Sequence, residues 1–528
     1  MMIGILVILL LAAAWVRSFR LDKSPASVNW DEAALGYNAY SLLLTGRDEF
    51  GKALPVSLRS FDDYKPAGYA YLSVPAVKLF GLSEASTRMT SVISGTLAVF
   101  LIVYITAKLT GNYLTGLIAG AVMAGSPWAI HFSRIAFESN VATMWYLAGI
   151  SAFILGLKKR QMLPVSLALF IISMYIYHAQ RAIALPTFAA LAIIYRQRFV
   201  PALKENWKSW LIIGTGLLIP LGSSFLTEAA GNRLTATNIF KLWPFVPGEF
   251  PQLIFNPVYS LMWQITGQFL AYFSPANLFL RGSQEPILRI PGLGLFNIEL
   301  LPFWLVGLWQ TFRNKKWGPG LWVLLALTPL PGVITWNWFS VVRTVSLYPI
   351  MAIVIAVGIT WVSKKITKYW GKIIFGFATG GILGAAFLYN LLTITLFAPY
   401  VTYGDFQPGF ETSVPYMLAE AAKYDKVVIE SPHIAPYIFV LFYGKYPPQQ
   451  YLQDAGLNRK NSGTEDYQFG KFEFRKITRA DLYGKNILLM GPTTAIPDWR
   501  KEEMQKSKIK VEDFLDPMGY IGFRVADL

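Results

Sequence analysis

Two adjacent carboxylates follow the first apolar run of the chain, in Asn29-Trp30-Asp31-Glu32. A carboxylate just outside a membrane can take a proton from an acceptor hydroxyl or hold a divalent cation. The same residue types are also typical of the first turn of a helix. Asp31 and Glu32 are therefore candidate catalytic residues, with a plain helix start as the alternative.

A lysine follows in the same stretch, in Asp63-Tyr64-Lys65-Pro66. At a membrane surface the Lys65 ammonium would be near the lipid headgroups, where it can pair with a phosphate. A lysine in such a place can also snorkel to the interface without any ligand. Lys65 is thus a candidate phosphate-binding residue.

The composition places these residues in a membrane protein. Of 528 residues, 54% are apolar and 15% are charged, whereas a soluble domain averages about 45–50% apolar and about 25% charged. The net charge is +16, and residues 1–399 carry 31 Lys and Arg against 14 Asp and Glu. These basic residues flank apolar runs, so we expect a lipid bilayer and no nucleic acid as partner. The absence of cysteine excludes disulfides, thiolate metal sites and cysteine nucleophiles.

Apolar runs divide the first 399 residues, and a helix needs about 20 apolar residues to cross a bilayer. We therefore expect an α-helical polytopic membrane protein of about eleven spans. The stretch 66–83 contains Pro66, Pro75 and Lys78, which suit an interfacial helix better than a span. The runs are 2–16, 87–107, 113–129, 140–157, 162–178, 182–195, 209–226, 294–311, 318–335, 344–362 and 373–397.

Lys and Arg in the short loops predict the orientation of these spans. The clusters at 158–160, 196–208, 313–316 and 364–372 belong on the cytoplasmic side. The transmembrane catalytic domain, 1–399, then has extracytoplasmic loops at 17–86 and 227–293. No Asn-x-Ser/Thr acceptor occurs, which favours the cytoplasmic membrane of a prokaryote.

The tail, residues 400–528, is a different kind of sequence. Short apolar stretches such as 426–430 and 487–490 alternate with polar turns, and a helix is expected through 433–444. This pattern predicts a small extracytoplasmic α/β domain.

Four arginines lie at the outer ends of predicted spans, where topology alone does not favour them. Ionisable residues near membrane depth are costly and tend to be functional, and several guanidinium groups on one surface suit a lipid-linked phosphate. Structural pairing is the alternative for each of them. Glu138 is either an ion-pair partner of the arginine four residues before it or a second acidic member of the site. The arginines are Arg88, Arg134, Arg181 and Arg343, and the three histidines, His131, His178 and His433, show no zinc-site spacing.

Together these motifs resemble the large membrane glycosyltransferases of the GT-C fold, and are similar to protein O-mannosyltransferases and to the bacterial aminoarabinose transferase that modifies lipid A. A small extracytoplasmic domain at the end of the chain also fits this resemblance. The chain departs from the pattern at Ala67, where relatives commonly have a second proline, and at Tyr64, where some have an acidic residue. The resemblance is carried by Trp30-Asp31-Glu32, Tyr64-Lys65-Pro66, Glu84-Ala-Ser-Thr-Arg88, Ser126-Pro127 and Arg134 to Glu138.

The resemblance implies inverting transfer of a sugar from a polyprenyl-phosphate donor to an acceptor hydroxyl of a protein, lipid or glycan, on the extracytoplasmic side. It gives Asp31 the role of general base, Glu32 a supporting or cation-binding role, and Lys65 and Arg88 the donor phosphate. The need for a divalent cation stays open. From the topology we add Arg134, His178, Arg181 and Arg343 to the phosphate site, and Glu138 to the acidic residues.

Two other functions remain possible from the sequence. A transporter or lipid flippase predicts ionisable groups in the middle of spans and matched halves, and neither is visible. A glycan ligase or polymerase that uses lipid-linked sugars is expected to place its charged pair in a late outer loop.

Overall fold

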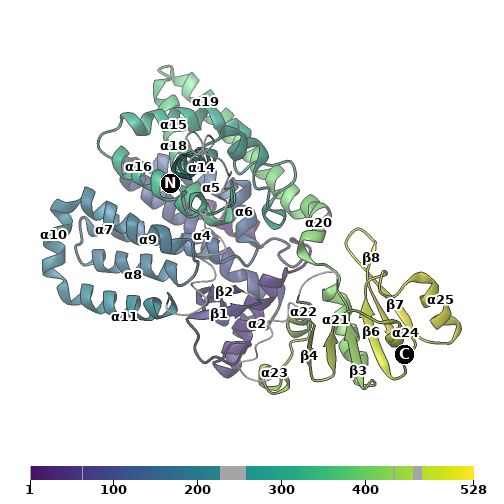
Figure 1. Ribbon diagram of the computed structural model, residues 1–528. Coiled ribbons are helices and arrows are strands. Elements are labelled where there is room, and N and C mark those ends of the chain that lie inside the picture. The colour runs from purple at the N-terminus through teal and green to yellow at the C-terminus, as the bar shows by residue number, and fades with distance from the viewer. Residues whose placement is uncertain (1, 62, 226–256, 432–434, 456–465) are drawn as a thin grey trace, which may run out of the picture. The chain divides into compact units, whose positions relative to one another are not determined.

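The computed structural model describes residues 2–61, 63–225, 257–431, 435–455 and 466–528. The chain forms two compact units, shown as a ribbon in Figure 1. Unit 1 consists of Met1–Phe19, Ser91–Ser133 and Phe137–Ile394, and unit 2 consists of Arg20–Thr90, Arg134–Ala136 and Thr395–Leu528.

Unit 1 is helical. Helices α7, α8 and α9 pack side by side in chain order, and α11 lies against α8 (Figure 1). Helix α18 packs against α5 and α15, and almost its whole length is buried. The helices are α1 (Met2–Ser18), α4 (Glu84–Thr110, which begins in unit 2), α5 (Tyr113–Gly125), α6 (Pro127–Ser133), α7 (Glu138–Gly156), α8 (Met162–Met174), α9 (Gln180–Ile194), α10 (Arg196–Glu205), α11 (Trp207–Phe225), α14 (Pro257–Ala271), η2 (Asn277–Arg281), η3 (Pro286–Leu288), η4 (Ile298–Leu300), α15 (Leu301–Arg313), α16 (Gly318–Leu327), α17 (Leu330–Val333), η5 (Val342–Thr344), α18 (Leu347–Lys365), α19 (Tyr369–Leu392) and η6 (Thr393–Phe397, which ends in unit 2).

Among the described residues, four helices are long and apolar enough to cross a membrane: α4, α7, α18, and α19 with its continuation to Val401. The number rises to six if the bent pairs α5–α6 and α9–α10 each form one span. Three further apolar segments, α1, α8 and α16–α17, are shorter. An α-helical protein with several candidate spans is therefore confirmed, but the expected count of eleven is not.

The difference in span count has a local cause. Residues 113–129 read as one apolar run, but the chain bends by 62° between α5 and α6, where Pro127 follows Ser126. Proline lacks an amide hydrogen and restricts the preceding residue to extended conformations, so the helix stops there. The expected loop 227–293 is described only from residue 257, and its residues 227–256 lie outside the described part of the chain.

Unit 2 combines the first outer loop with the tail. The loop contributes helix α2 (Trp30–Thr45), the antiparallel hairpin of β1 (Ser57–Ser60) and β2 (Asp63–Pro66), and helix α3 (Gly68–Phe80). The tail contributes α20 (Ala398–Val401), η7 (Tyr403–Phe406), α21 (Phe410–Ala421), β3 (Lys426–Ile429), α22 (Tyr437–Tyr443), α23 (Pro448–Ala455), β4 (Tyr467–Phe469), β5 (Phe472–Phe474), α24 (Arg479–Leu482), β6 (Ile487–Gly491), α25 (Asp498–Lys506), β7 (Val511–Leu515) and β8 (Ile521–Asp527).

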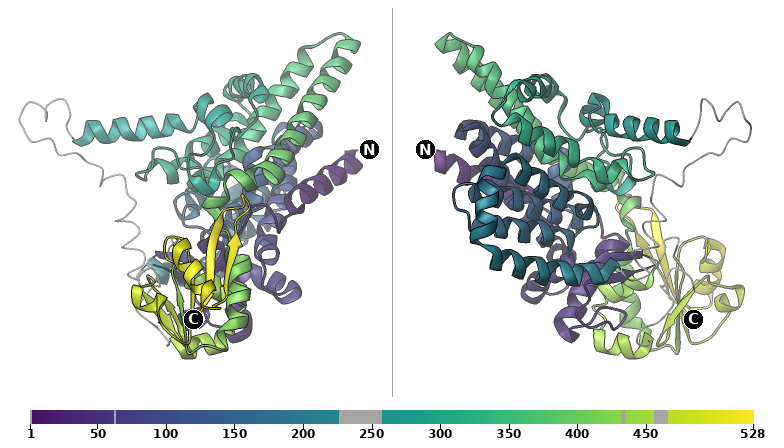
Figure 2. Two further views of the ribbon diagram at one scale, coloured as in Figure 1. Left: turned by 90° about the vertical axis from the view of Figure 1, so that its right-hand side faces the viewer. Right: turned by 60° about the vertical axis from the view of Figure 1, so that its left-hand side comes forward.

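The tail forms a six-stranded mixed sheet in the order β4-β5-β3-β6-β8-β7 (Figure 2). Strand β3 is parallel to β5 and β6, whereas β4, β7 and β8 pair antiparallel with their neighbours. Both strands expected from the sequence form, as β3 and β6, and the expected helix is α22. His433 lies outside the described residues.

Helix α2 packs against α22 and α23, so the first loop and the tail share one hydrophobic core. Gly36 marks the closest approach: an added Cβ would lie 2.5 Å from Thr87 Oγ1 and 2.6 Å from Phe442 Cε2. Tyr37 is fully buried beside it, with its ring edge-to-face with that of Tyr451. This packing fixes where α2, and the carboxylates at its start, stand in unit 2.

We expect Gly36→Val to lower the free energy of unfolding of unit 2 by about 1–3 kcal/mol, because the new methyl groups overpack this contact. Gly404→Val is the matched control, since an added Cβ there has no atom within 4 Å. Proteolysis across a urea series measures both variants. Equal resistance of the two would contradict the packing described here.

Candidate active site

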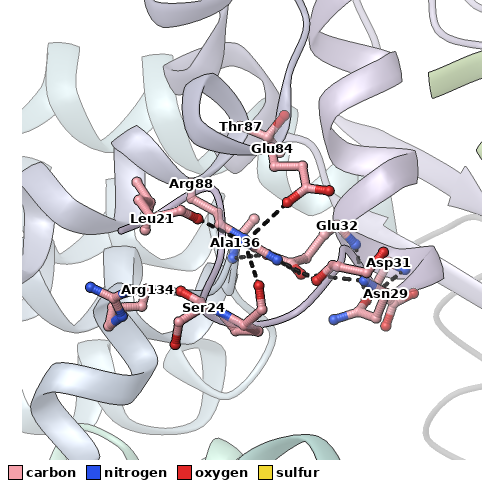
Figure 3. A network of polar contacts seen from close by, with 12 residues as sticks. Leu21, Ser24, Asn29, Asp31, Glu32, Glu84, Thr87, Arg88, Arg134 and Ala136 are labelled. Carbon is pink, nitrogen blue, oxygen red and sulfur yellow. Dashed lines mark hydrogen bonds and ion pairs between the residues drawn. The ribbon is translucent and has the colours of Figure 1, made fainter. Parts of the chain in front are cut away.

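Asp31 is held by the cap of helix α2. The Asn29 side chain accepts hydrogen bonds from the backbone N–H of Asp31 (2.8 Å) and Glu32 (3.0 Å). Glu32 completes a capping box by accepting from the Asn29 N–H at 3.3 Å (Figure 3). The helix start expected as the alternative therefore forms. Because a capping box fixes the first turn, it also sets the position of the Asp31 carboxylate.

Glu32 and Arg88 form a fully buried ion pair. Arg88 Nε donates to Glu32 Oε1 at 3.0 Å and Nη2 donates to Oε2 at 3.1 Å, and both side chains are 0% exposed. The Ala136 N–H donates to the same carboxylate at 2.7 Å. This bidentate geometry is the strongest form of a charge-assisted pair, and it joins the start of α2 to the start of α4 (Figure 3).

The remaining donors of Arg88 are also engaged. Its Nη1 donates to the carbonyls of Leu21 (3.0 Å) and Pro25 (3.3 Å) and lies 3.5 Å from Glu84, and its Nη2 donates to the Ser27 carbonyl. A guanidinium has five N–H donors, and here they serve the pair and the loop before α2. The geometry favours a structural use of Arg88, and its expected contact with a phosphate stays a prediction.

Arg134 has a similar surrounding. Its Nη2 donates to the carbonyls of Ser24 (2.8 Å) and Arg20 (3.2 Å), and its side chain is fully buried. Residues 134–136 form a turn, so Arg134 and Glu138 do not share a helix as their spacing suggested. Arg134 and Arg88 thus both hold the irregular segment 20–27.

Asp31 and Lys65 form the pair that remains accessible. Their side chains are 33% and 13% exposed and make an ion pair. The hairpin places Lys65, since it stands opposite Leu58 in the register of β1 and β2. No group of three His, Asp or Glu able to hold a metal occurs in the part of the chain that the structure describes.

Residues of the tail complete this site, and the sequence gave no sign of them. The Trp30 N–H donates to the side chain of Gln407 (3.1 Å). The Tyr443 hydroxyl donates to Glu84 (2.7 Å) and lies 2.9 Å from the Ser27 hydroxyl. No local motif marks these side chains, because each acts through a contact across more than 350 residues of chain.

Two of these buried polar groups have raised pKa values. Burial raises the pKa of Glu411, although hydrogen bonds from the Gly409 N–H (2.8 Å) and the Ser27 hydroxyl (3.4 Å) oppose the shift. Burial also raises the pKa of Tyr443, and the nearby acid groups add to that shift. Tyr443 therefore stays a neutral hydrogen-bond donor at physiological pH.

The other expected site residues belong to unit 1. Glu138 is the first residue of α7 and is buried, His178 lies in the turn before α9, and Arg181 is on α9. Arg181 Nη2 approaches the Ser224 hydroxyl at 3.4 Å. Their roles in binding a phosphate, or in acid chemistry for Glu138, stay predictions.

Arg343 lies in η5 near a buried carboxylate, also in unit 1. Burial raises the pKa of Glu285, although the hydrogen bond from the Ser340 hydroxyl (2.8 Å) and the positive charge of Arg343 lower it. Arg343 Nη1 is buried and has no hydrogen-bond partner among the described residues.

No protein-family model and no curated protein matches this chain. Among solved structures, the chain is similar to ArnT from Cupriavidus metallidurans in the apo state, with a TM-score of 0.57 and 13% identity over 99% of this chain and 98% of that chain. The same protein bound to undecaprenyl phosphate gives a TM-score of 0.55 at 12% identity, over the same shares. The oligosaccharyltransferase from Archaeoglobus fulgidus gives 0.49 at 12% identity, over 99% and 74%.

The likeness to ArnT extends over nearly the whole of both chains. ArnT is a membrane glycosyltransferase of the GT-C fold. This chain therefore has the GT-C fold, as the motifs in its first 140 residues predict.

Removing Arg88 should destabilise unit 2 strongly. Arg88→Met leaves the Glu32 charge buried without its partner, which typically costs about 3–5 kcal/mol. The double variant Arg88→Met/Glu32→Met should recover part of this loss. The control is Arg160→Met, because Arg160 pairs with Glu205 on the surface, where a pair contributes at most about 1 kcal/mol. Equal urea midpoints for the two single variants would show that the buried pair does not hold the loop.

Proposed function

We propose that this chain is an integral-membrane inverting glycosyltransferase, which moves a sugar from a polyprenyl-phosphate donor to an acceptor hydroxyl on the extracytoplasmic side. The observation that carries the proposal is the accessible Asp31–Lys65 pair, held on a buried frame within a GT-C fold. ArnT, which shares the fold, has been solved with undecaprenyl phosphate, and this supports a lipid phosphate as partner.

Asp31 serves as the general base in this proposal. Its carboxylate takes the proton of the acceptor hydroxyl while the oxygen attacks the anomeric carbon of the donor. The new glycosidic bond forms as the bond to the phosphate oxygen breaks, and the polyprenyl phosphate leaves with the electron pair. Attack from the face opposite the phosphate inverts the anomeric centre.

Lys65 links the two charges of this reaction. In the structure its ammonium pairs with Asp31, and a bound donor phosphate would attract the same ammonium. A shift of Lys65 toward the phosphate stabilises the charge on the leaving group and frees Asp31 to act as base. Its positive charge also disfavours a divalent cation at Asp31, so we propose no step that involves a metal.

Glu32, Arg88 and Arg134 act as positioning residues in this proposal, because their side chains are buried and bonded to one another or to the loop. Glu138, His178, Arg181 and Arg343 remain candidate contacts to donor or acceptor from unit 1. A glycan ligase or polymerase, or a transporter, remains an alternative that the assays below distinguish.

Asp31→Asn should lower turnover about 10²–10⁴-fold, the usual contribution of general-base catalysis. The assay follows radiolabelled sugar from polyprenyl-phosphate donors into cell-envelope extract, with purified protein. Asp22→Asn is the matched control, since Asp22 is an exposed aspartate of the same loop. Near-normal transfer by Asp31→Asn would remove this residue from the role, and movement of unreacted donor across vesicles would favour a transporter.

Lys65→Met should weaken binding of undecaprenyl phosphate about tenfold or more, because a charge-assisted contact to the phosphate is lost. Lys65→Arg should keep part of the affinity. Microscale thermophoresis with the lipid phosphate in nanodiscs measures this, and Lys52→Met, which alters an exposed lysine of the same loop, is the control. The same affinity for all four proteins would place the phosphate elsewhere.

A further inference from the structure

An aromatic cleft lies along helix α14 in unit 1. It has a volume of about 450 Å³ and is lined by Tyr259, Ser260, Trp263, Gln264 and Trp338. The indole rings are strongly exposed, with Trp263 at 68% and Trp338 at 52%. Helix α14 stands out from the other helices of unit 1 in both views of Figure 2, so this face is open to a ligand.

The arrangement of this cleft is specific. The Trp338 ring rests on α14 at Gly267, where an added Cβ would lie 2.6 Å from the indole. A glycine at that point lets the indole lie close to the helix, beside the side chains of Trp263 and Gln264. Two aromatic faces and an amide thus meet at one place.

A stripe of polar residues runs along α14 from the cleft into the protein. Ser260, Gln264 and Gln268 are spaced four residues apart, so each is the neighbour of the next on the helix surface. Tyr272 continues the stripe just after the helix, and its hydroxyl accepts from the Ser340 N–H at 3.0 Å. The polar atoms at this end of α14 therefore belong to one connected region.

This region contains buried polar atoms that lack hydrogen bonds. Gln268 is 0% exposed, and neither its amide oxygen nor its amide nitrogen has a partner among the described residues. Asn337 Oδ1 and Arg343 Nη1, in the segment that carries Trp338, are also buried without partners there. Because native proteins leave few such atoms unpaired, a bound group with donors and acceptors is expected.

From these features we infer that the α14 cleft binds a neutral sugar ring, packed on the two indoles and hydrogen-bonded by the amides. Each sugar hydroxyl both donates and accepts, so it can satisfy the Gln268 amide and the Asn337 oxygen. The apolar C–H face of the ring suits an aromatic surface, as pockets that combine aromatic walls with few polar groups commonly do.

Other ligand types fit less well. A lipid chain would leave Gln268 and Asn337 without hydrogen bonds. A phosphate would suit Arg343 but would meet the Asn337 oxygen, an acceptor, and the Glu285 carboxylate, whose charge already faces Arg343. A neutral ring meets neither obstacle. The place of this sugar in catalysis, as part of an acceptor glycan, rests on the proposed function.

Binding is tested on the full chain in nanodiscs, by saturation-transfer NMR with methyl glycosides of glucose, galactose and mannose as probes. At least one probe should bind, and Trp338→Ala and Gln268→Leu should each weaken it tenfold or more. Trp370→Ala, which removes an exposed indole of α19, is the control and should bind as the wild type does. Absence of binding by every probe, or equal binding by all variants, would overturn the inference and leave only an interfacial aromatic belt.

Two further measurements separate this inference from misfolding and from the proposed function. Gln268→Leu should unfold at or above the wild-type urea midpoint, because it replaces an unpaired buried amide with an apolar group. Asp31→Asn should bind the sugar as the wild type does. Sugar binding without any transfer activity would support the cleft and count against the glycosyltransferase.

The transfer assay distinguishes the two sources of the sugar. If the cleft holds the acceptor, Trp338→Ala raises the KM for acceptor tenfold or more and leaves the KM for the polyprenyl-phosphate donor unchanged. A rise in the donor KM alone would assign the cleft to the sugar of the donor. Active transfer with both KM values unchanged would overturn the inference.

Discussion

The ion pair of Glu32 and Arg88 is the interaction on which the candidate site depends. The segment before α2 is irregular, and its buried carbonyls need donors that no regular element supplies. Two guanidinium groups supply them, and Glu32 balances the charge that this brings into the interior. The cost of burying one charge is offset only while the other stays in place, so loop, helix start and pair stand together.

This frame leaves Asp31 as the carboxylate that can act. Asp31 and Glu32 are adjacent in sequence but point to different surroundings: one is bound to a buried arginine, whereas the other reaches the surface beside Lys65. Neighbours on a helix lie about 100° apart around its axis, so a single turn separates a structural acid from a reactive one. The Asp-Glu pair is thus a helix start and a candidate catalytic element at once.

Much of the fold could be predicted from the sequence, because apolar runs, loop charges and the motifs around Asp31, Lys65 and Arg88 are local signals. The number of spans could not, since the length of a run does not reveal a bend such as the one at Pro127. The role of the arginines was equally hidden: a guanidinium at the end of a span suits a phosphate or a set of backbone carbonyls, and only the fold decides. Gln407 and Tyr443 could not be found at all, because they reach the site from the far end of the chain.

Unit 2 is assembled from three stretches that are far apart in the chain, and this has a consequence for biosynthesis. The Trp30–Gln407 contact spans 377 residues, so the ribosome must complete most of the protein before the early loop can find its partners. Until then its charged groups must wait in a partly formed state, exposed to proteases and chaperones. Chemistry at Asp31 therefore becomes available only at the end of translation, and a prematurely released fragment would be inert.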